Sequence, residues 1–166
     1  MARRISYRNL PQMLLHAREG LLCNFRHIHH HYGLTDQQWR VMRTLSEEQE
    51  LEPREICEAC NILSPSLAGV LARMEKMGVI EKERMAEDQR RVLVRLTKKG
   101  EQVVADVAPL VEAQYQELEK VVGADLVKTL YEVLDQVIAT CKRDPIPRVA
   151  LPEGGAVASD EALADD

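Results

Sequence analysis

Aromatic residues are scarce in this sequence. Its 166 residues include one Phe, one Trp and four Tyr. Leu, Val, Ile, Met and Ala must therefore fill the core, which favours helix packing over a β-sandwich. No apolar run approaches the length of a membrane span, and no hydrophobic signal segment opens the chain. These absences predict a soluble, cytoplasmic protein that is not bound to a membrane.

Cysteine is also infrequent, with four residues in the chain. Cys57 and Cys60 form a CxxC motif, but no second CxxC or HxxxH pair lies at zinc-finger spacing. The histidine run HIHHH places His27 and His31 one helical turn apart, without an accompanying HExxH. These patterns favour buried thiols and a solvated or pocket-edge histidine cluster, so we expect no metal site. Metal or redox sensing stays an open alternative.

Enzyme motifs are absent as well. The chain has no nucleophile elbow, no Gly-rich phosphate loop and no clearly paired carboxylates. We therefore expect neither an enzyme nor a bound cofactor.

An excess of positive charge is lacking too, since the formal net charge is -5. Residues 144–166 alone contribute this -5, and the other 143 residues carry 21 cations and 21 acids. Residues 1–46 have seven arginines against two acids. Local cation density, rather than the total, governs binding to phosphates. The global sign is therefore a weak objection to DNA binding.

Apolar spacing predicts a mainly helical chain with two short strands. Gly33 ends the first expected helix, and Thr35 or Asp36 caps the second. Ser64, followed by Pro65, opens a later helix in an N-cap-then-Pro arrangement. The expected helices cover 12–32, a segment from 35 or 36 to an acidic break at 46–52, and then 53–60, 64–77, 97–122 and 125–141. The expected strands cover 79–84 and 91–96.

Helix, strand, charged turn, strand and helix follow one another between residues 64 and 100. This order predicts a winged helix-turn-helix, mainly α with a two- to three-stranded wing sheet and terminal dimerisation helices. The expected parts are a basic arm at 1–11, a single domain at 12–143 and a disordered acidic tail at 144–166. Within the domain we expect a reading head at about 35–98 and dimerisation helices at about 12–32 and 98–143.

Several motifs resemble the MarR-type transcriptional regulators over residues 12–142. They are the helix order, the DxR at Asp88-Gln89-Arg90 and the LTxxG at Leu96-Thr97-Lys98-Lys99-Gly100. Segments 17–19, 34–40 and 63–75 are most similar to the homoprotocatechuate-degradation repressors within that family. The resemblance implies a homodimeric repressor of aromatic catabolism that a small aromatic acid releases from DNA.

The helix at 64–77 is the expected recognition helix. One face carries an apolar stripe (Leu67, Val70, Leu71 and Met74), and the opposite face carries small side chains and cations. Small residues let a helix enter a major groove, and Arg73 can span the O6 and N7 atoms of guanine. Gly69 lowers helix propensity without an evident structural gain. The alternative is an ordinary solvated face. The residues predicted to contact DNA on this helix are Ser64, Pro65, Ser66, Gly69, Arg73 and Lys76.

The wing adds Asp88, Arg90 and Arg91. An arginine at a hairpin tip can enter a minor groove, and Asp88 can orient the Arg90 guanidinium. An exposed hairpin ion pair of little energetic worth is the alternative.

An effector site is predicted around Arg18, Trp39 and Arg43. Arg18 lies among leucines, where a cation needs an anionic partner, and Trp39 and Arg43 are one helical turn apart. Stacking on the indole and a bidentate guanidinium suit an aromatic carboxylate, with Leu14 and Leu22 beside them. The alternatives are a salt bridge from Arg18 to Glu19 or to an acid of a partner chain, with Trp39 in the core.

The predicted partners are therefore a near-palindromic double-stranded operator, an aromatic carboxylate and a second copy of the chain. A phenolic acid such as homoprotocatechuate and a hydroxynicotinate satisfy the same pattern equally well. A metal- or redox-sensing regulator of the same fold and a helical protein-interaction module remain alternatives.

Overall fold

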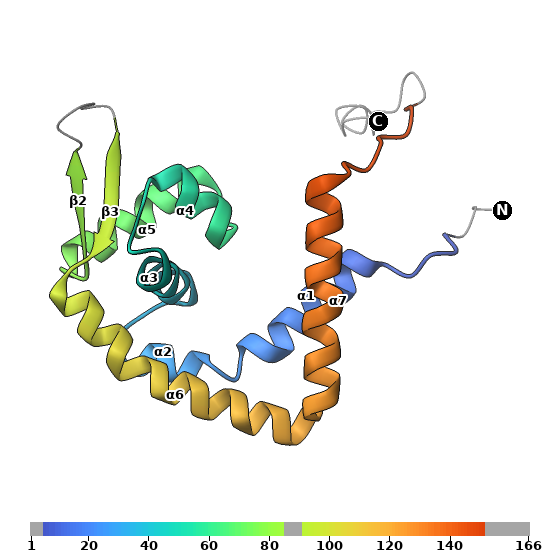
Figure 1. Ribbon diagram of the computed structural model, residues 1–166, viewed down its shortest axis with the longest axis horizontal. Coiled ribbons are helices and arrows are strands. Elements are labelled where there is room, and N and C mark those ends of the chain that lie inside the picture. Colours follow the sequence, from blue (N-terminus) through green and yellow to red (C-terminus); the bar gives the residue numbers. More distant parts are fainter. Residues whose placement is uncertain (1–4, 85–90, 152–166) are drawn as a thin grey trace, which may run out of the picture. The chain divides into compact units, whose positions relative to one another are not determined.

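The computed structural model describes residues 5–84 and 91–151. The chain divides into two compact units, Met1–Val121 and Val122–Asp166. The first unit combines helices with one small antiparallel sheet, which confirms the expected fold class (Figure 1). Within the described ranges, every helix is too short or too polar to cross a lipid bilayer.

Seven helices and three strands are assigned within the described residues. In chain order they are α1 Leu10–Leu22, α2 Arg26–His31, α3 Asp36–Glu48, β1 Glu50–Leu51, α4 Pro53–Cys60, α5 Ser64–Lys76, β2 Ile80–Arg84, β3 Val92–Leu96, α6 Lys98–Val122 and α7 Ala124–Arg143. Most expected bounds differ from these by two residues or fewer.

The expected continuous helix over 12–32 is divided into α1 and α2. The side-chain amide of Asn24 donates to the carbonyl oxygens of Gly20 at 2.7 Å and Leu21 at 3.2 Å. Such local bonds compete with the helical ladder, and the backbone forms a tight turn at this point. Phe25 is buried after the turn, and its ring centroid lies 4.7 Å from that of Tyr115 on α6.

α3 begins with the expected cap and ends later than expected. Thr35 and Gln38 form a reciprocal capping box, in which each side chain accepts from the backbone N–H of the other residue. The acidic segment 46–52 was expected to be a break, but α3 continues to Glu48. Gln49, at φ 70°, then leads into β1.

The sheet has the strand order β1-β3-β2, and both pairings are antiparallel. Leu51 lies opposite Val94, and Ile80 lies opposite Leu96. Val94 and Leu96 are buried, whereas Arg95 between them is exposed, so β3 alternates as the sequence predicted. The strands β2 and β3 form the wing (Figure 1).

One apolar core holds the reading head together. All four predicted stripe positions of α5 are buried in it, and α6 continues unbroken through Pro109 to close one side. Helices α3 to α6 and the sheet all contribute to this core. Its residues include Val41, Met42, Leu45, Ile56, Leu67, Val70, Leu71, Met74, Ile80, Val94, Val107 and Val111.

α7 belongs to the second unit. It follows Gly123, whose φ of 95° suits glycine, and its sequence repeats apolar residues at helical spacing. Its apolar side chains Leu126, Tyr131, Val133, Val137 and Ile138 are about half exposed. The predicted tail falls at 144–151 on exposed, irregular chain, and its remainder, 152–166, lies outside the described residues.

Candidate DNA-binding and effector sites

α5 begins at Ser64, the residue that the sequence predicted as its cap. The carbonyl oxygen of Leu63 accepts from the backbone N–H groups of Ser66 and Leu67, so Leu63 is the N-cap and Ser64 is already helical. Pro65 therefore occupies the second helical position. A proline is tolerated there because that N–H needs no intrahelical partner.

The predicted DNA-contacting face of α5 points away from the core. Arg73 and Lys76 are exposed, and neither takes part in an ion pair within the described part of the chain. The three residues that open the helix, Ser64, Pro65 and Ser66, are exposed too. This face therefore combines small side chains with two cations that no carboxylate neutralises.

Gly69 lies on the same face. A Cβ placed there would meet only the Nη1 atom of Arg73, at 3.5 Å, which is an ordinary contact. The packing within the chain thus gives no reason for a glycine at this position. Close approach of another molecule to the backbone would give one.

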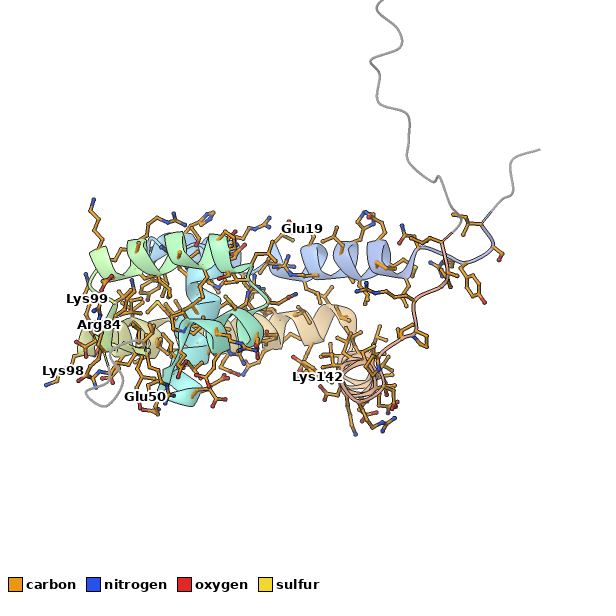
Figure 2. The ribbon with its side chains drawn as sticks, turned by 90° about the horizontal axis from the view of Figure 1, so that it is seen from above. Glu19, Glu50, Arg84, Lys98, Lys99 and Lys142 are labelled. Carbon is orange, nitrogen blue, oxygen red and sulfur yellow. The ribbon has the colours of Figure 1, made fainter. Side chains whose placement is uncertain are left out.

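The wing tip was expected to present Asp88 and Arg90, but both lie outside the described residues. Arg91 just precedes β3, and its Nε donates to Oε1 of Glu52 at 2.6 Å. Glu52 is also the N-cap of α4, so this contact connects the wing to the helix-turn-helix. Arg84 ends β2 on the opposite strand (Figure 2).

The LTKKG motif joins α6 to the end of α5. Thr97 donates from Oγ1 to the carbonyl oxygen of Gly78 at 2.7 Å and accepts from the backbone N–H of Gly100. Lys99, labelled in Figure 2, donates from Nζ to the carbonyl oxygen of Met77 at 2.7 Å. A Cβ at Gly100 would overlap the carbonyl oxygen of Val79. Only glycine therefore allows this close contact.

Trp39 and Arg43 share one side of α3 near α6. Arg43 pairs with Glu47 and hydrogen-bonds Tyr115. Burial opposes the charge on Arg43, but these two hydrogen bonds raise its pKa above the usual arginine value. Arg43 and Tyr115 thus meet between α3 and α6, and Phe25 packs on Tyr115. Trp39 lies in the core, where its ring stacks on His29. Tyr115 and Phe25 were not among the predicted site residues, because no sequence spacing connects them to α3.

A chain of ion pairs links α1, α2 and α3. Arg26 contacts Glu19 at 2.7 Å and Asp36 at 3.1 Å, and Asp36 contacts Nδ1 of His29 at 2.9 Å (Glu19 is labelled in Figure 2). His29 in turn stacks on Trp39, with ring centroids 5.7 Å apart. Burial alone would raise the pKa of Asp36, but hydrogen bonds from His29 and Arg26 hold it below the ordinary value.

The residues predicted on α1 are not brought together with Trp39 and Arg43. Leu14 and Arg18 are exposed, Leu22 is partly buried, and α1 has no fully buried residue. Glu19, the expected alternative partner of Arg18, is paired with Arg26 instead. Membership of Arg18, Leu14 and Leu22 in the effector site stays a prediction.

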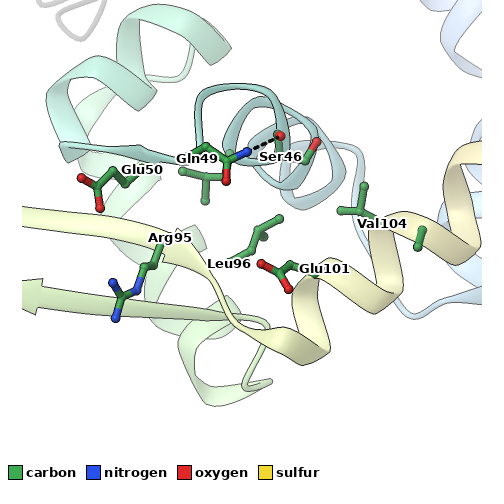
Figure 3. Close-up of a pocket in the computed structure, with 9 residues that line it drawn as sticks. Ser46, Gln49, Glu50, Arg95, Leu96, Glu101 and Val104 are labelled. Atoms are coloured by element: carbon green, nitrogen blue, oxygen red, sulfur yellow. Dashed lines mark hydrogen bonds between the residues drawn. The ribbon is translucent and has the colours of Figure 1, made fainter.

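A cavity of about 380 Å³ lies elsewhere, between the end of α3, β1, β3 and the start of α6 (Figure 3). Glu50 and Glu101 line it, and Arg95 beside them already pairs with Glu81 and Glu83. None of the predicted effector residues lines this cavity. Its excess of carboxylates makes it a poor site for an anionic ligand.

The CxxC pair lies on α4. Cys60 is buried and Cys57 is partly buried, and both are free thiols. The Cys60 sulfur lies 3.4 Å from Oγ1 of Thr44. Across residues 5–84 and 91–151, no three His, Cys, Asp or Glu side chains are grouped so that they can hold a metal ion.

Known proteins with a similar sequence are transcriptional regulators. The family model for the transcriptional regulators SarA/Rot matches residues 24–107. The HTH-type transcriptional regulator FarR of Neisseria gonorrhoeae is 36% identical over 75% of this chain and 85% of its own length. The homoprotocatechuate degradative operon repressor of Escherichia coli is 33% identical over 84% of this chain and 95% of its own length.

Solved structures of similar proteins agree with this result. NadR in complex with 4-hydroxyphenylacetate superimposes with a TM-score of 0.71 at 34% identity, over 82% of this chain and 97% of NadR. A mutant of MarR from E. coli, complexed with operator DNA, gives a TM-score of 0.70 at 25% identity, over 77% and 92% of the two chains. These relatives are regulators and not enzymes. With its winged sheet, its helix order and this similarity over most of its length, the chain belongs to the MarR family of transcriptional regulators.

Proposed function

We propose that this protein is a homodimeric repressor of an aromatic-compound catabolic operon, and that a small aromatic carboxylate releases it from its operator. The proposed DNA binding rests mainly on the residues that face outward from α5. Arg73 and Lys76 are exposed there and pair with no carboxylate of the described residues, and the small side chains next to them permit entry into a major groove. The similar MarR chain was solved with operator DNA.

A second copy of the chain is the proposed partner of α1 and α7. α1 exposes Leu10, Leu14 and Leu15, and α7 exposes the apolar stripe described above. Exposed apolar faces of this extent are costly in water and are typical of subunit interfaces. A two-fold dimer would place its recognition helices about one turn of DNA apart, which matches a near-palindromic operator.

The effector is proposed to bind near Arg43. The Arg43 guanidinium hydrogen-bonds Tyr115 and lies one helical turn from Trp39 in the sequence. It offers a charge for a carboxylate, and these aromatic residues offer rings for an aromatic body. One similar repressor is named for the operon that degrades homoprotocatechuate, and NadR was solved with 4-hydroxyphenylacetate; both compounds are hydroxyphenyl acids. Binding there would shift the spacing of the two recognition helices and weaken both DNA contacts.

The test measures effector binding by isothermal titration calorimetry on the DNA-free dimer. 4-Hydroxyphenylacetate is expected to bind the natural protein and to bind Arg43→Gln at least tenfold more weakly, because the charge-assisted bond is lost. Arg54→Gln is the matched control, since Arg54 forms the same kind of exposed pair one turn from Glu58. Equal affinity in both variants would rule out Arg43 as the carboxylate partner.

Release from DNA is measured separately by fluorescence anisotropy. A labelled duplex from the region upstream of the protein's own coding sequence is bound first, and the acid is then added. The proposal expects the acid to lower the DNA affinity of the natural protein and to have much less effect on Arg43→Gln. A DNA complex that withstands saturating concentrations of every aromatic acid tested would contradict it.

A further inference from the structure

Glu52 lies at a junction of the reading head. It directly follows β1, whose Leu51 lies opposite Val94 on β3, and it is the N-cap of α4. Its side chain accepts from the backbone N–H of Glu55, and its own backbone N–H donates to Oε2 of Glu55 at 2.7 Å. This reciprocal capping box holds the Glu52 carboxylate at the start of α4.

The same carboxylate binds Arg91. The Nε atom of Arg91 donates to Oε1 of Glu52 at 2.6 Å, and its Nη2 atom contacts the same oxygen. Hydrogen bonds between charged groups are stronger than those between neutral groups. Because Arg91 immediately precedes β3, this pair connects the wing directly to the first turn of α4.

The strand pairing shows why this connection matters for the wing. β1 pairs with Val94 and Arg95, near the end of β3. The first residues of β3 lie beyond β1 and pair with β2. The contact between Glu52 and Arg91 therefore extends the attachment of β3 from the base of the sheet toward the wing.

The charge on Arg91 is balanced, which distinguishes it from the cations of α5. Glu52 neutralises its guanidinium, and a carboxylate at this position repels a phosphate. Attraction to DNA depends on local cations that replace the counterions of the phosphates. Arg73 and Lys76 pair with no carboxylate of the described residues, so they suit that role better than Arg91 does.

We propose that Glu52 is a positioning residue for DNA binding, which fixes the wing relative to the helix-turn-helix through Arg91. Arg91 is then a link between the two parts, in place of the DNA contact predicted from the sequence. This inference rests on the proposed DNA binding and adds how the wing is oriented for it. A wing that is already oriented avoids the cost of ordering it when DNA binds.

The sign of one substitution separates the two roles of Arg91. Glu52→Gln keeps an oxygen that can accept from the N–H of Glu55 but removes the charge that holds Arg91. If Arg91 contacts phosphate, loss of the neighbouring carboxylate raises the affinity for DNA. We expect Glu52→Gln instead to lower the affinity for the upstream duplex about three- to fivefold, measured by fluorescence anisotropy.

The double variant Glu52→Gln/Arg91→Gln tests whether the two residues act as one unit. Arg91→Gln alone should also lower the affinity about three- to fivefold, and the double variant should lose no more than either single variant. Its dependence on salt should match that of the natural protein, because no phosphate contact is lost. A gain of affinity in Glu52→Gln, a loss in the double variant equal to the product of the single losses, or a shallower salt dependence would overturn the inference.

Glu58→Gln is the matched control. Glu58 lies on the same helix and forms an exposed pair with Arg54, at 3.2 Å, that does not involve the wing. This substitution also removes one negative charge, and it should leave the affinity unchanged or raise it slightly. A loss as large as that of Glu52→Gln would overturn the inference, because it would assign the effect to α4 alone.

Hydroxyl-radical footprinting distinguishes positioning of the wing from a general loss of structure. With the duplex saturated by natural protein or by Glu52→Gln, protection at the central positions bound by α5 should be equal. Protection at the flanking positions bound by the wing should be weaker in the variant. Uniform weakening, or equal protection at the flanks, would overturn the inference. If the natural protein itself leaves the duplex unprotected, the proposed DNA binding fails first, and the inference fails with it.

Discussion

Lys99 donates its ammonium proton to the carbonyl oxygen of Met77, 2.7 Å away, and so ties the first turn of α6 to the residue that ends the recognition helix. Thr97 adds a second bond across the same joint. The LTKKG motif, which marks the family in the sequence, therefore connects the start of α6 to the end of α5 through these two hydrogen bonds.

Gly100→Ala should destabilise this joint. Its Cβ would overlap the Val79 carbonyl, and we expect the free energy of unfolding to fall by about 1–3 kcal/mol, as for other overpacked sites. Gly20→Ala is the control, because no atom lies near its Cβ position and alanine favours the helix. Urea unfolding of both variants checks this, and equal stability of the two would contradict the close contact.

Gly69→Ala should have opposite effects on stability and on DNA binding. Its Cβ has room and alanine is the better helix former, so stability should rise by up to about 1 kcal/mol. The added methyl group faces the proposed groove and should weaken operator binding. Thermal unfolding and anisotropy on the same preparation test both halves, and unchanged operator affinity would show that this backbone does not approach DNA.

Arg73→Ala and Lys76→Ala should have different effects on DNA binding: the first should change base preference, and the second should lower the affinity for every sequence. Loss of an arginine that reads a guanine edge costs about 1–3 kcal/mol at one operator position and relaxes the preference there. Loss of a lysine that contacts phosphate weakens binding to all sequences alike. A panel of duplexes with single base changes separates the two effects. If both variants lose the same relative affinity for every duplex of the panel, Arg73 does not read a base.

Asp36→Asn should remove an acid-sensitive part of the stability. The pKa of Asp36 is lowered in the folded protein, so its contribution is fully present above the unfolded value of about 4 and is lost as the pH falls through the folded value. At pH 7 the variant should lose about 1–3 kcal/mol, because the bonds to His29 and Arg26 involve charge.

That deficit should narrow as the pH falls below about 4, because the natural carboxylate then becomes protonated as well. Urea unfolding at both pH values measures it, with Asp106→Asn at an exposed position as the control. A deficit that stays constant with pH would show that the effect of the substitution is not electrostatic.

Local signals were enough to predict most of the fold. The capping box at Thr35, the stripe from Leu67 to Met74 and the alternation of β3 all depend on near neighbours in the sequence. The turn at Asn24 was missed because a side-chain amide interrupted an otherwise helical pattern. β1 was missed because two residues have no periodicity, and its pairing with Arg95 and Val94 spans more than forty residues.

The candidate sites also include features that the sequence predicts and features that only the packing reveals. The outward face of α5 follows directly from helical spacing, so the exposure of Arg73 and Lys76 was predictable from the sequence, and their contact with DNA stays a prediction. The contacts of Tyr115 with Arg43, of Arg91 with Glu52 and of His29 with Trp39 depend on how separate elements pack. The histidine run was predicted to be a solvated or pocket-edge cluster, with a metal site as the alternative. His29 is instead buried against Asp36, which nothing in the spacing of the run indicates.

The most direct test of the account is a salt titration of DNA binding. Affinity for the upstream duplex is measured by anisotropy between about 50 and 200 mM salt, because contacts to phosphates release counterions. We expect a steep, linear fall of log affinity with log salt, and a slope that is shallower by at least about one in Arg73→Ala/Lys76→Ala. A weak interaction that does not depend on salt, or a slope that the double substitution leaves unchanged, would contradict DNA binding through α5.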